Sequence, residues 1–419
     1  MSASSRLIEK LLARTIRRGT LTLTKSDGTR RTFGTSEDGF PDVAIRFADS
    51  KVARDIVLDP RLGLGEAYMD GRVLVEDGDI MALVTLARMN NRWEDKAVLG
   101  KPSASRRLRG KVKSFVRGIN RPGSSKRNVA HHYDIGNPLY ELMLDAEHMQ
   151  YSCAYFARDD MTLAEAQEAK LAHIASKLAL EPGLRVLDIG CGWGGMAIFL
   201  AERASVSVTG ITLSEEQLAL ARQRAEAAGV ADRVSFELVD YRDLAETGKT
   251  YDRIVSVGMF EHVGRPQFET YFRCCARLLE PDGVALVHTI GRLGEPGRTD
   301  AFTEKYIFPG GYIPALSETL EASEKVRLMA TDVEMLRIHY AKTIRAWYAN
   351  CLANRDAIVA LHDERFYRMW TFYLAGAATV FENGGMCNYQ VQFARDRRAL
   401  PLTRDYMGEA EDALLRRGG

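Results

Sequence analysis

Residues 185–195 read Arg-Val-Leu-Asp-Ile-Gly-Cys-Gly-Trp-Gly-Gly, which predicts a buried strand that passes through a glycine-rich turn into a helix. The turn fits the pattern Gly-x-Gly-x-x-Gly, and its glycines Gly190, Gly192 and Gly194 would let the backbone approach a nucleotide ligand closely. Asp188 lies just before the turn, where a carboxylate would sit poorly beside a pyrophosphate. A sulfonium ligand carries positive charge instead, so the segment favours S-adenosylmethionine over a dinucleotide.

Strand-like segments alternate with helical ones on both sides of this turn. We expect strands at 185–189, 207–212, 234–239, 251–257 and 283–290. Such alternation is typical of an α/β protein whose mostly parallel sheet has helices on both faces, here a Rossmann-like methyltransferase domain of class I. Ser214 and Gln217 predict the N-cap and capping box of a helix over 214–228. After residue 290 the periodicity turns helical, especially over 332–350 and 356–382.

The strand ends supply further candidate cofactor residues. The second strand ends without the acidic residue that a dinucleotide site uses for the ribose, so we expect Thr212, Ser214 and Gln217 to hold the ribose. The third strand ends in Asp240, Tyr241 and Arg242; Asp240 suits the adenine amino group and Tyr241 an aromatic wall. These neighbours favour methyl transfer over hydride transfer.

The N-terminal part differs in pattern, and 419 residues suit two domains. An amphipathic helix over 6–18 precedes a hairpin turn at Asp27-Gly28 and a strand over 43–47. The helix could lie on a membrane surface or pack on its own domain. We therefore expect a small α+β domain over 1–100, a linker over 101–128, the catalytic domain over 129–400 and a tail over 401–419.

Charge and cysteine content bound the environment. The net charge is +1, yet residues 101–127 carry ten Lys or Arg and no Asp or Glu. This stretch could be a solvated spacer or could contact anionic lipid head groups, whereas nucleic acid is not expected as a partner. Six cysteines without a Cys-x-x-Cys pair indicate neither a disulfide framework nor a zinc site. No apolar run is long enough for a bilayer, and no signal segment is visible, so we expect a cytoplasmic protein.

Several segments outside the turn are more specific. They are HHYDIGNPLYELML (131–144), MQYSCAYF (149–156), VSVGMFEHVG (255–264), KYIFPGG (305–311) and FYLAGAATVFENG (372–384). Together with 186–195 they resemble the cyclopropane-fatty-acyl-phospholipid synthase family, which is related to the mycolic acid cyclopropane synthases. The resemblance spans about 129–395, and GEAYMDG at 65–71 extends it into the N-terminal domain. That extension implies the phospholipid-modifying branch.

The resemblance implies a reaction in which an acyl double bond attacks the methyl carbon of the sulfonium. Loss of a proton from the new methyl group then closes the three-membered ring, and the family uses a bicarbonate ion as the base. Carried over by position, this ion would be held by Cys153, Glu261, His288, the Ile290 backbone and Tyr340.

The resemblance also implies the surroundings of the reaction. Tyr151 and Ser152 are expected to close over the methionine end of the cofactor. Cys387 is a further candidate as a reactive thiol, with a structural role as its alternative. Aromatic residues could line an acyl tunnel: Tyr306, Phe308, Trp347 and Tyr373. The partner would be a membrane of anionic or zwitterionic phospholipid with unsaturated acyl chains, met peripherally at the inner membrane face, and the family resemblance implies a homodimer.

Two alternatives remain open. An enzyme with the same acyl substrate could stop after methyl transfer and give a methyl-branched or methylene product. A protein of another class, a lipid-binding scaffold without catalysis, could keep the same fold. Retention of Asp188, Gly190, Gly192 and Glu261 argues against the scaffold.

Overall fold

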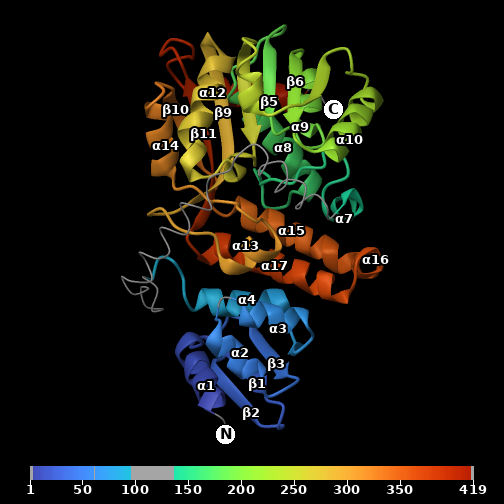
Figure 1. The fold of residues 1–419 in the computed structure, drawn as a ribbon, viewed down its shortest axis with the longest axis vertical. Coiled ribbons are helices and arrows are strands. Elements are labelled where there is room, and N and C mark those ends of the chain that lie inside the picture. The colour runs from blue at the N-terminus through green and yellow to red at the C-terminus, as the bar shows by residue number, and fades with distance from the viewer. Residues whose placement is uncertain (1–2, 61, 96–135, 417–419) are drawn as a thin grey trace. The chain divides into compact units, whose positions relative to one another are not determined.

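The computed structural model describes residues 3–60, 62–95 and 136–416 (Figure 1). The chain forms two compact units, each discontinuous in sequence. The first comprises Met1–Arg106, Thr299–Pro309 and Ala341–Met386, and the second Arg107–Arg298, Gly310–Tyr340 and Cys387–Gly419. Two stretches expected in the catalytic domain, 299–309 and 341–386, thus belong to the first unit. The expected basic linker, 101–128, lies outside the described residues.

A seven-stranded sheet organises the second unit, in the order β10-β11-β9-β8-β5-β6-β7 (Figure 1). Its strands are β5 (Arg185–Ile189), β6 (Ser207–Thr212), β7 (Val234–Leu238), β8 (Tyr251–Val257), β9 (Leu279–Arg292), β10 (Met329–Met335) and β11 (Met386–Ala394). Strands β5 to β9 pair in parallel, and β10 pairs antiparallel with β11. The five expected strands and the mostly parallel sheet are confirmed.

Helices cover both faces of this sheet, as expected. They are α7 (Asn137–Met143), α8 (Leu163–Ser176), α9 (Gly195–Ala204), α10 (Glu215–Ala227), α11 (Tyr241–Leu244), α12 (Phe268–Leu278), α14 (Leu316–Glu324) and α18 (Asp405–Arg416). One apolar core joins the sheet to residues of α8, α9, α10 and α18. A second core joins it to residues of α11, α12 and α14. The domain is a Rossmann-like α/β fold.

The expected helix over 332–350 is wrong in its first part. Residues 329–335 form strand β10, and α15 (His339–Ala353) begins only afterwards. Strand β10 pairs antiparallel with β11, and the paired residues lie between 54 positions (Met335↔Tyr389) and 65 positions (Met329↔Ala394) apart in the sequence. The local pattern of apolar residues carries no information about a partner so distant in the sequence. Neither strand was therefore expected from the sequence.

A four-stranded sheet in the order β2-β1-β3-β4 forms the base of the first unit. Its strands are β1 (Gly19–Thr24), β2 (Arg30–Thr35), β3 (Asp42–Phe47) and β4 (Val73–Asp77). The expected hairpin is confirmed: β1 and β2 are antiparallel, and Gly28 in their turn has φ +81°. The expected strand over 43–47 corresponds to β3.

Helices complete the first unit. They are α1 (Ala3–Thr15), α2 (Val52–Leu58), α3 (Gly63–Met69), α4 (Ile80–Met89), α13 (Ala301–Tyr306), most of α15, α16 (Arg355–Leu361) and α17 (Glu364–Asn383). Helix α1 packs against α2 and buries Ile8, which fits the second interpretation of segment 6–18, packing on its own domain. The expected helix over 356–382 is divided at Asp363, which caps α17 by accepting from the Phe366 amide at 2.6 Å.

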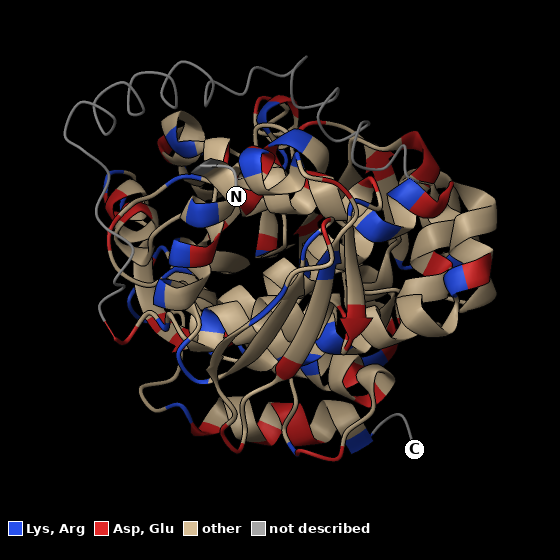
Figure 2. Ribbon diagram, turned by 90° about the horizontal axis from the view of Figure 1, so that it is seen from below, with Lys and Arg blue, Asp and Glu red and all other residues tan. Residues whose placement is uncertain are grey.

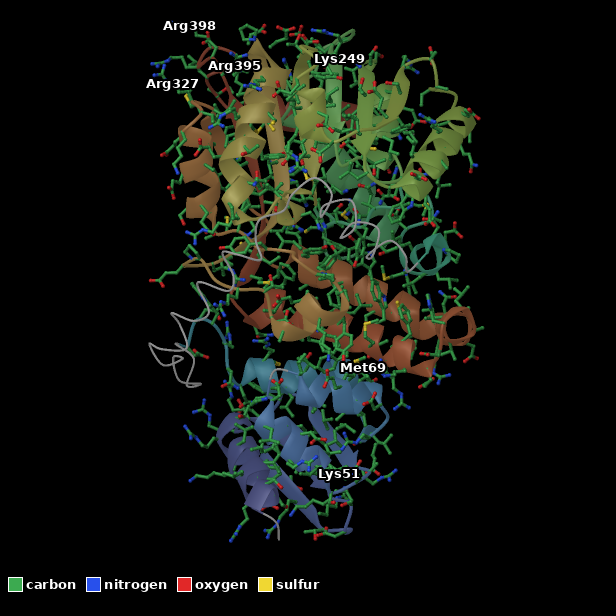
Figure 3. All side chains as sticks on the ribbon, viewed as in Figure 1. Lys51, Met69, Lys249, Arg327, Arg395 and Arg398 are labelled. Atoms are coloured by element: carbon green, nitrogen blue, oxygen red, sulfur yellow. The ribbon has the colours of Figure 1, made fainter. Side chains whose placement is uncertain are left out.

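Charge is distributed evenly on the described ribbon, where basic and acidic positions are interspersed (Figure 2). No helix in the described ranges is long and apolar enough to cross a membrane. Figure 3 labels Lys249, Arg327 and Arg395 at one end of the second unit, the end at which β8 and β10 begin and β11 finishes. The glycine-rich turn follows β5 at the other end of the sheet, where ligands of such folds bind.

Candidate active site

The glycine-rich turn has the backbone geometry that its sequence predicts. Gly190, Gly192 and Gly194 have φ of +82°, +54° and +82°, which side chains other than glycine rarely adopt. The amide of Gly190 donates to the Ile211 carbonyl at 2.9 Å, which ties the turn to the end of β6. A Cβ on Gly192 would meet no heavy atom within 4 Å. The turn is therefore open at its centre, where a cofactor can approach the backbone.

A second loop covers the start of α9. A Cβ on Gly195 would lie 2.3 Å from both the His148 carbonyl oxygen and Gln150 Nε2, so only glycine permits this approach. Asp145 holds the loop, because its carboxylate accepts from the amides of His148 at 2.6 Å and Gln150 at 3.0 Å. The next residues, Tyr151 and Ser152, were the ones expected at the methionine end of the cofactor. Their place beside the turn is consistent with that expectation.

Aromatic rings fix this arrangement. The ring of Tyr140, on α7, lies 5.1 Å from the ring of Tyr151 and 5.0 Å from that of Trp193 in the turn. Trp193 Nε1 also donates to Asn137 Oδ1 at 3.0 Å. Helix α7 therefore packs against both segments that would enclose the cofactor.

Asp188, the penultimate residue of β5, is a buried carboxyl group. It is 2% exposed, and its Oδ2 has no hydrogen-bond partner among the described residues. Burial raises its pKa to about 7, against the opposing charge of Lys170. An unpartnered oxygen at this place could accept a hydrogen bond from a ligand.

Lys170 was missed by the sequence analysis. It lies on α8 with no exposed surface, and its Nζ donates to Ser152 Oγ at 3.0 Å and to the Gln150 side chain. Burial lowers its pKa to about 7. A lysine in an alanine-rich helix is normally expected at the surface, so local sequence gave no signal for this role.

The residues expected at the ribose form a compact set of hydrogen bonds. Thr212 Oγ1 donates to Gln217 Oε1 at 2.9 Å, and the Gln217 amide donates to Ser214 Oγ at 3.2 Å. Ser214 is thus the N-cap of α10, as predicted. The second half of the predicted capping box is wrong, because the Gln217 side chain accepts from Thr212 and does not return to the Ser214 amide.

The residues expected at the adenine follow β7. Arg242 clamps Asp240 with Nε at 2.8 Å from Oδ1 and Nη2 at 2.6 Å from Oδ2. Tyr241 is 9% exposed and packs edge-on against Tyr271 at 5.4 Å in the apolar core. Tyr241 therefore contributes to the core, while Asp240 keeps the strand-end position that its predicted role needs.

Glu261 lies in a short helical turn, Phe260–His262, after β8. Its Oε1 accepts from the Ile290 amide at 2.6 Å, and its Oε2 is buried without a partner among the described residues. Burial raises the pKa of Glu261 to about 7, although the hydrogen bond from the Ile290 amide lowers this pKa. The structure thus brings Glu261 and the Ile290 backbone into direct contact.

His288 precedes Ile290 by two residues on β9, so both lie on the same face of the strand. Its ring is 1% exposed; Nδ1 lies 3.1 Å from Gln390 Nε2, and Nε2 has no described partner. Burial holds the pKa of His288 well below its usual value, so the ring is neutral. The carbonyl of His288 accepts from Gly258 at 2.9 Å, which aligns the Glu261 segment with β9.

The remaining predicted residues are divided between the two units. Cys153 and Tyr340 belong to the second unit and are 0% and 7% exposed. Cys387, in β11, is 1% exposed, and burial raises its pKa to about 12. A thiol kept protonated in this way is a poor nucleophile, which favours the structural role of Cys387. The expected tunnel residues all lie in the first unit: Tyr306, Phe308, Trp347 and Tyr373.

The fold and these residues together define a class. The glycine-rich turn lies at the end of β5, next to the middle strand β8. Buried acids follow two parallel strands, and an antiparallel strand interrupts the sheet near one edge. These are features of an S-adenosylmethionine-dependent methyltransferase of class I.

Comparison with known proteins narrows the class. A family model described as mycolic acid cyclopropane synthetase matches residues 121–391, and one described as a domain of unknown function matches residues 7–93. A cyclopropane-fatty-acyl-phospholipid synthase of Escherichia coli is 38% identical over 86% of this chain and 90% of its own. The chain belongs to the mycolic acid cyclopropane synthetase family.

Two further relatives are informative. A probable fatty acid methyltransferase of Pseudomonas putida is 41% identical over 67% of this chain and 73% of its own. A solved structure of mycolic acid cyclopropane synthase CmaA1 with SAH and CTAB has a TM-score of 0.60 and 36% identity, and covers 64% of this chain and 98% of that one.

Proposed function

We propose that the protein transfers a methylene group from S-adenosylmethionine to the cis double bond of unsaturated acyl chains in membrane phospholipids. Family membership makes it an S-adenosylmethionine-dependent enzyme that forms cyclopropanes on unsaturated acyl chains. The observation that carries the proposal concerns Glu261, which follows β8, and His288, on the neighbouring strand β9: each has a buried polar atom without a partner among the described residues. Such atoms are costly unless a ligand satisfies them.

The cofactor would lie against the glycine-rich turn. Gly192 leaves room at the backbone, Asp188 offers an unpartnered oxygen, and Tyr151 and Ser152 would cover the methionine end. Thr212, Ser214 and Gln217 would contact the ribose, and Asp240 the adenine. In this arrangement the residues around the turn would hold the cofactor and shield its sulfonium from water.

Bicarbonate is the proposed second ligand, held by Cys153, Glu261, His288 and Tyr340, with the Ile290 backbone acting through Glu261. The unpartnered Glu261 Oε2 and His288 Nε2 fit an oxyanion, provided that each donates a proton. Burial favours the protonated carboxyl of Glu261 up to about pH 7, so Oε2–H can donate. When bound, bicarbonate would supply the base that ring closure requires. The Ile290 amide already donates to Glu261 and so acts by orienting that carboxyl group.

The site of action would be the cytoplasmic face of the inner membrane. The acyl substrate lies in a bilayer, and no described helix of the chain could span one. Peripheral binding would therefore bring enzyme and substrate together, with the basic segment 101–127 as a candidate contact for anionic head groups. We expect a homodimer, on the family resemblance alone.

A second candidate is methyl transfer without ring closure, which gives a methyl-branched or methylene product. The similarity to a probable fatty acid methyltransferase is the observation that favours this second candidate. The buried pair Glu261 and His288 supports the ring-forming outcome, because it retains a place for the deprotonating ion.

The test is direct. The protein is incubated with S-adenosylmethionine and vesicles of cis-unsaturated phosphatidylethanolamine and phosphatidylglycerol, and the released acyl chains are identified by mass spectrometry. We expect cyclopropane acyl chains, lower turnover in buffer stripped of carbon dioxide, and recovery when bicarbonate is added. An absence of any altered acyl chain would contradict both candidates and leave the lipid-binding scaffold.

A further inference from the structure

A line of buried polar side chains runs behind His288. It joins α8, β10 and β11 to β9 and consists of Glu334, Lys177, Gln390 and His288 itself. Lys177, Gln390 and His288 are each at most 1% exposed. Buried hydrogen bonds of this kind have fixed donor and acceptor roles, because no water can exchange with them.

The first contact fixes the amide of Gln390. Lys177 Nζ lies 2.6 Å from Gln390 Oε1. A lysine ammonium has only donors, so the group that faces it must be the amide oxygen. The amide nitrogen of Gln390 then faces the opposite way, toward His288.

The second contact fixes His288. Gln390 Nε2 lies 3.1 Å from His288 Nδ1, and an amide nitrogen can only donate. His288 Nδ1 must therefore accept and carry no proton. We propose that Gln390, oriented by Lys177, is a positioning residue that holds neutral His288 in the tautomer with its proton on Nε2.

The surroundings keep the ring neutral. Lys170, Lys177 and His173 are the positive groups that oppose a charge on His288, while Glu334 favours it and burial disfavours it most. Glu334 is itself engaged, since it accepts from Lys177 and from His173 Nε2 at 2.6 Å. The negative charge of Glu334 is therefore paired with Lys177 and His173, and it does little to stabilise a positive charge on His288.

The consequence lies at the other ring nitrogen. His288 Nε2 carries the proton, is buried and has no partner among the described residues. It is thus a ready donor for an oxyanion, and the opposite tautomer would present a lone pair that repels one. This consequence rests on the proposed function, whereas the tautomer itself does not.

The tautomer can be measured without an activity assay. Histidine labelled with ¹⁵N is incorporated into the full chain, and long-range ¹H–¹⁵N correlation spectra are recorded, with a His288→Gln sample for assignment. We expect His288 Nδ1 at the high shift of an unprotonated imidazole nitrogen and Nε2 at the low shift of a protonated one. A protonated Nδ1 in the wild-type protein would overturn the inference.

A variant reverses the contact with little change of shape. In Gln390→Glu the carboxylate can still pair with Lys177 but must accept from His288, so Nδ1 should become protonated. We expect kcat for ring formation to fall at least about tenfold, with the Kd for S-adenosylmethionine unchanged within about twofold. Tyr389→Phe is the control, because it removes a buried hydrogen bond of 2.9 Å to Thr319 from the adjacent residue of β11. Its His288 shifts and kcat should remain those of the wild type.

The outcomes separate the two proposals. An inactive wild-type enzyme with Nδ1 unprotonated would overturn the proposed function and support the positioning role. Full activity in a Gln390→Glu variant whose Nδ1 is protonated would overturn the link between tautomer and reaction. If Gln390→Glu does not fold, the wild-type spectrum alone decides the tautomer.

Discussion

Two carboxyl groups of the site, Asp188 and Glu261, are buried deeply enough to have a pKa of about 7. Each has one oxygen without a described partner. A carboxyl group in this condition can donate as well as accept a hydrogen bond near neutral pH, whereas an exposed carboxylate can only accept. At the residue scale, burial is therefore the main source of the chemistry that we propose.

Replacement of Glu261 by Gln tests this view. Glutamine keeps the shape, can still accept from the Ile290 amide and can still donate from Nε2, but it cannot give a proton to an oxyanion or take one from it. We expect ring formation to fall by about 10²-fold or more, while the affinity for S-adenosylmethionine is retained. Product analysis and calorimetric titration measure the two quantities. Unchanged turnover would remove the role of Glu261.

Glu261 also predicts a pH dependence of stability. Its pKa is raised from 4.5 to about 7 in the folded chain, so between these values the folded state holds a proton that the unfolded state has released. The contribution of Glu261 to the free energy of unfolding is therefore fully present below about pH 4.5 and is lost as the pH rises through about 7.

Glu261→Gln should remove that loss. We expect its free energy of unfolding, relative to wild type, to increase between pH 5 and pH 8 by up to about 3 kcal/mol. Urea unfolding at both pH values gives the difference. The same difference at both values would show that Glu261 does not titrate in this range.

The sequence could identify residues whose types and spacing carry a motif, such as Asp188, Glu261 and His288. It could not identify Lys170 or Gln390, because each acts through residues distant along the chain. The predicted role of Ile290 also changes, since its amide is already used by Glu261. Which cofactor and bicarbonate contacts these residues make stays a prediction.

At the element scale, the junction between the 145–152 loop and helix α9 leaves no room for a side chain at its centre. Glycine is the only residue type that fits at position 195, because a Cβ on Gly195 would lie 2.3 Å from the His148 carbonyl oxygen. We expect Gly195→Ala to cost about 1–3 kcal/mol of stability and to weaken S-adenosylmethionine binding, since the loop must move. Urea unfolding and calorimetric titration test both effects.

Gly376→Ala is the matched control. Gly376 lies within helix α17, and a Cβ there would meet nothing within 4 Å. The same chemical change should stabilise the protein here by about 0.5–1 kcal/mol, because alanine has the higher helix propensity. Equal effects of the two substitutions would contradict the steric account of Gly195.

Elements with a strong local pattern were predictable, and those defined by distant pairing were not. Strands β5, β6 and β8 match their expected residues 185–189, 207–212 and 251–257. Strands β10 and β11 depend on each other, although their paired residues lie at least 54 positions apart in the sequence. Pairing over such a distance leaves little local pattern for either strand.

At the scale of the whole molecule, the chain returns twice from its second unit to its first. Residues 299–309 and 341–386 belong with the N-terminal sheet, and the segments around them belong with the seven-stranded sheet. In the first unit, helix α17 packs against α3 and α4. The expected domains were each one continuous stretch of the sequence. Units that combine separate stretches of the chain cannot be described by such boundaries. Those boundaries stay a prediction.

Binding to membranes is the prediction that belongs to the whole molecule. Replacing the ten Lys and Arg of 101–127 by Gln should weaken binding to vesicles that contain phosphatidylglycerol. The loss should be largest at low salt, because screening reduces the attraction of the wild type. Vesicle co-sedimentation at several salt concentrations measures it. Equal binding by both proteins would favour the solvated spacer.

The central claim is that the protein closes a cyclopropane ring on an acyl double bond. Its most direct test uses S-adenosylmethionine with a fully deuterated methyl group and vesicles of cis-unsaturated phospholipid, followed by mass and NMR spectra of the acyl products. Ring closure predicts a product that keeps two of the three deuterium atoms and shows cyclopropane resonances. A product that keeps all three deuterium atoms on a methyl branch, or a methylene product without ring resonances, would contradict the claim.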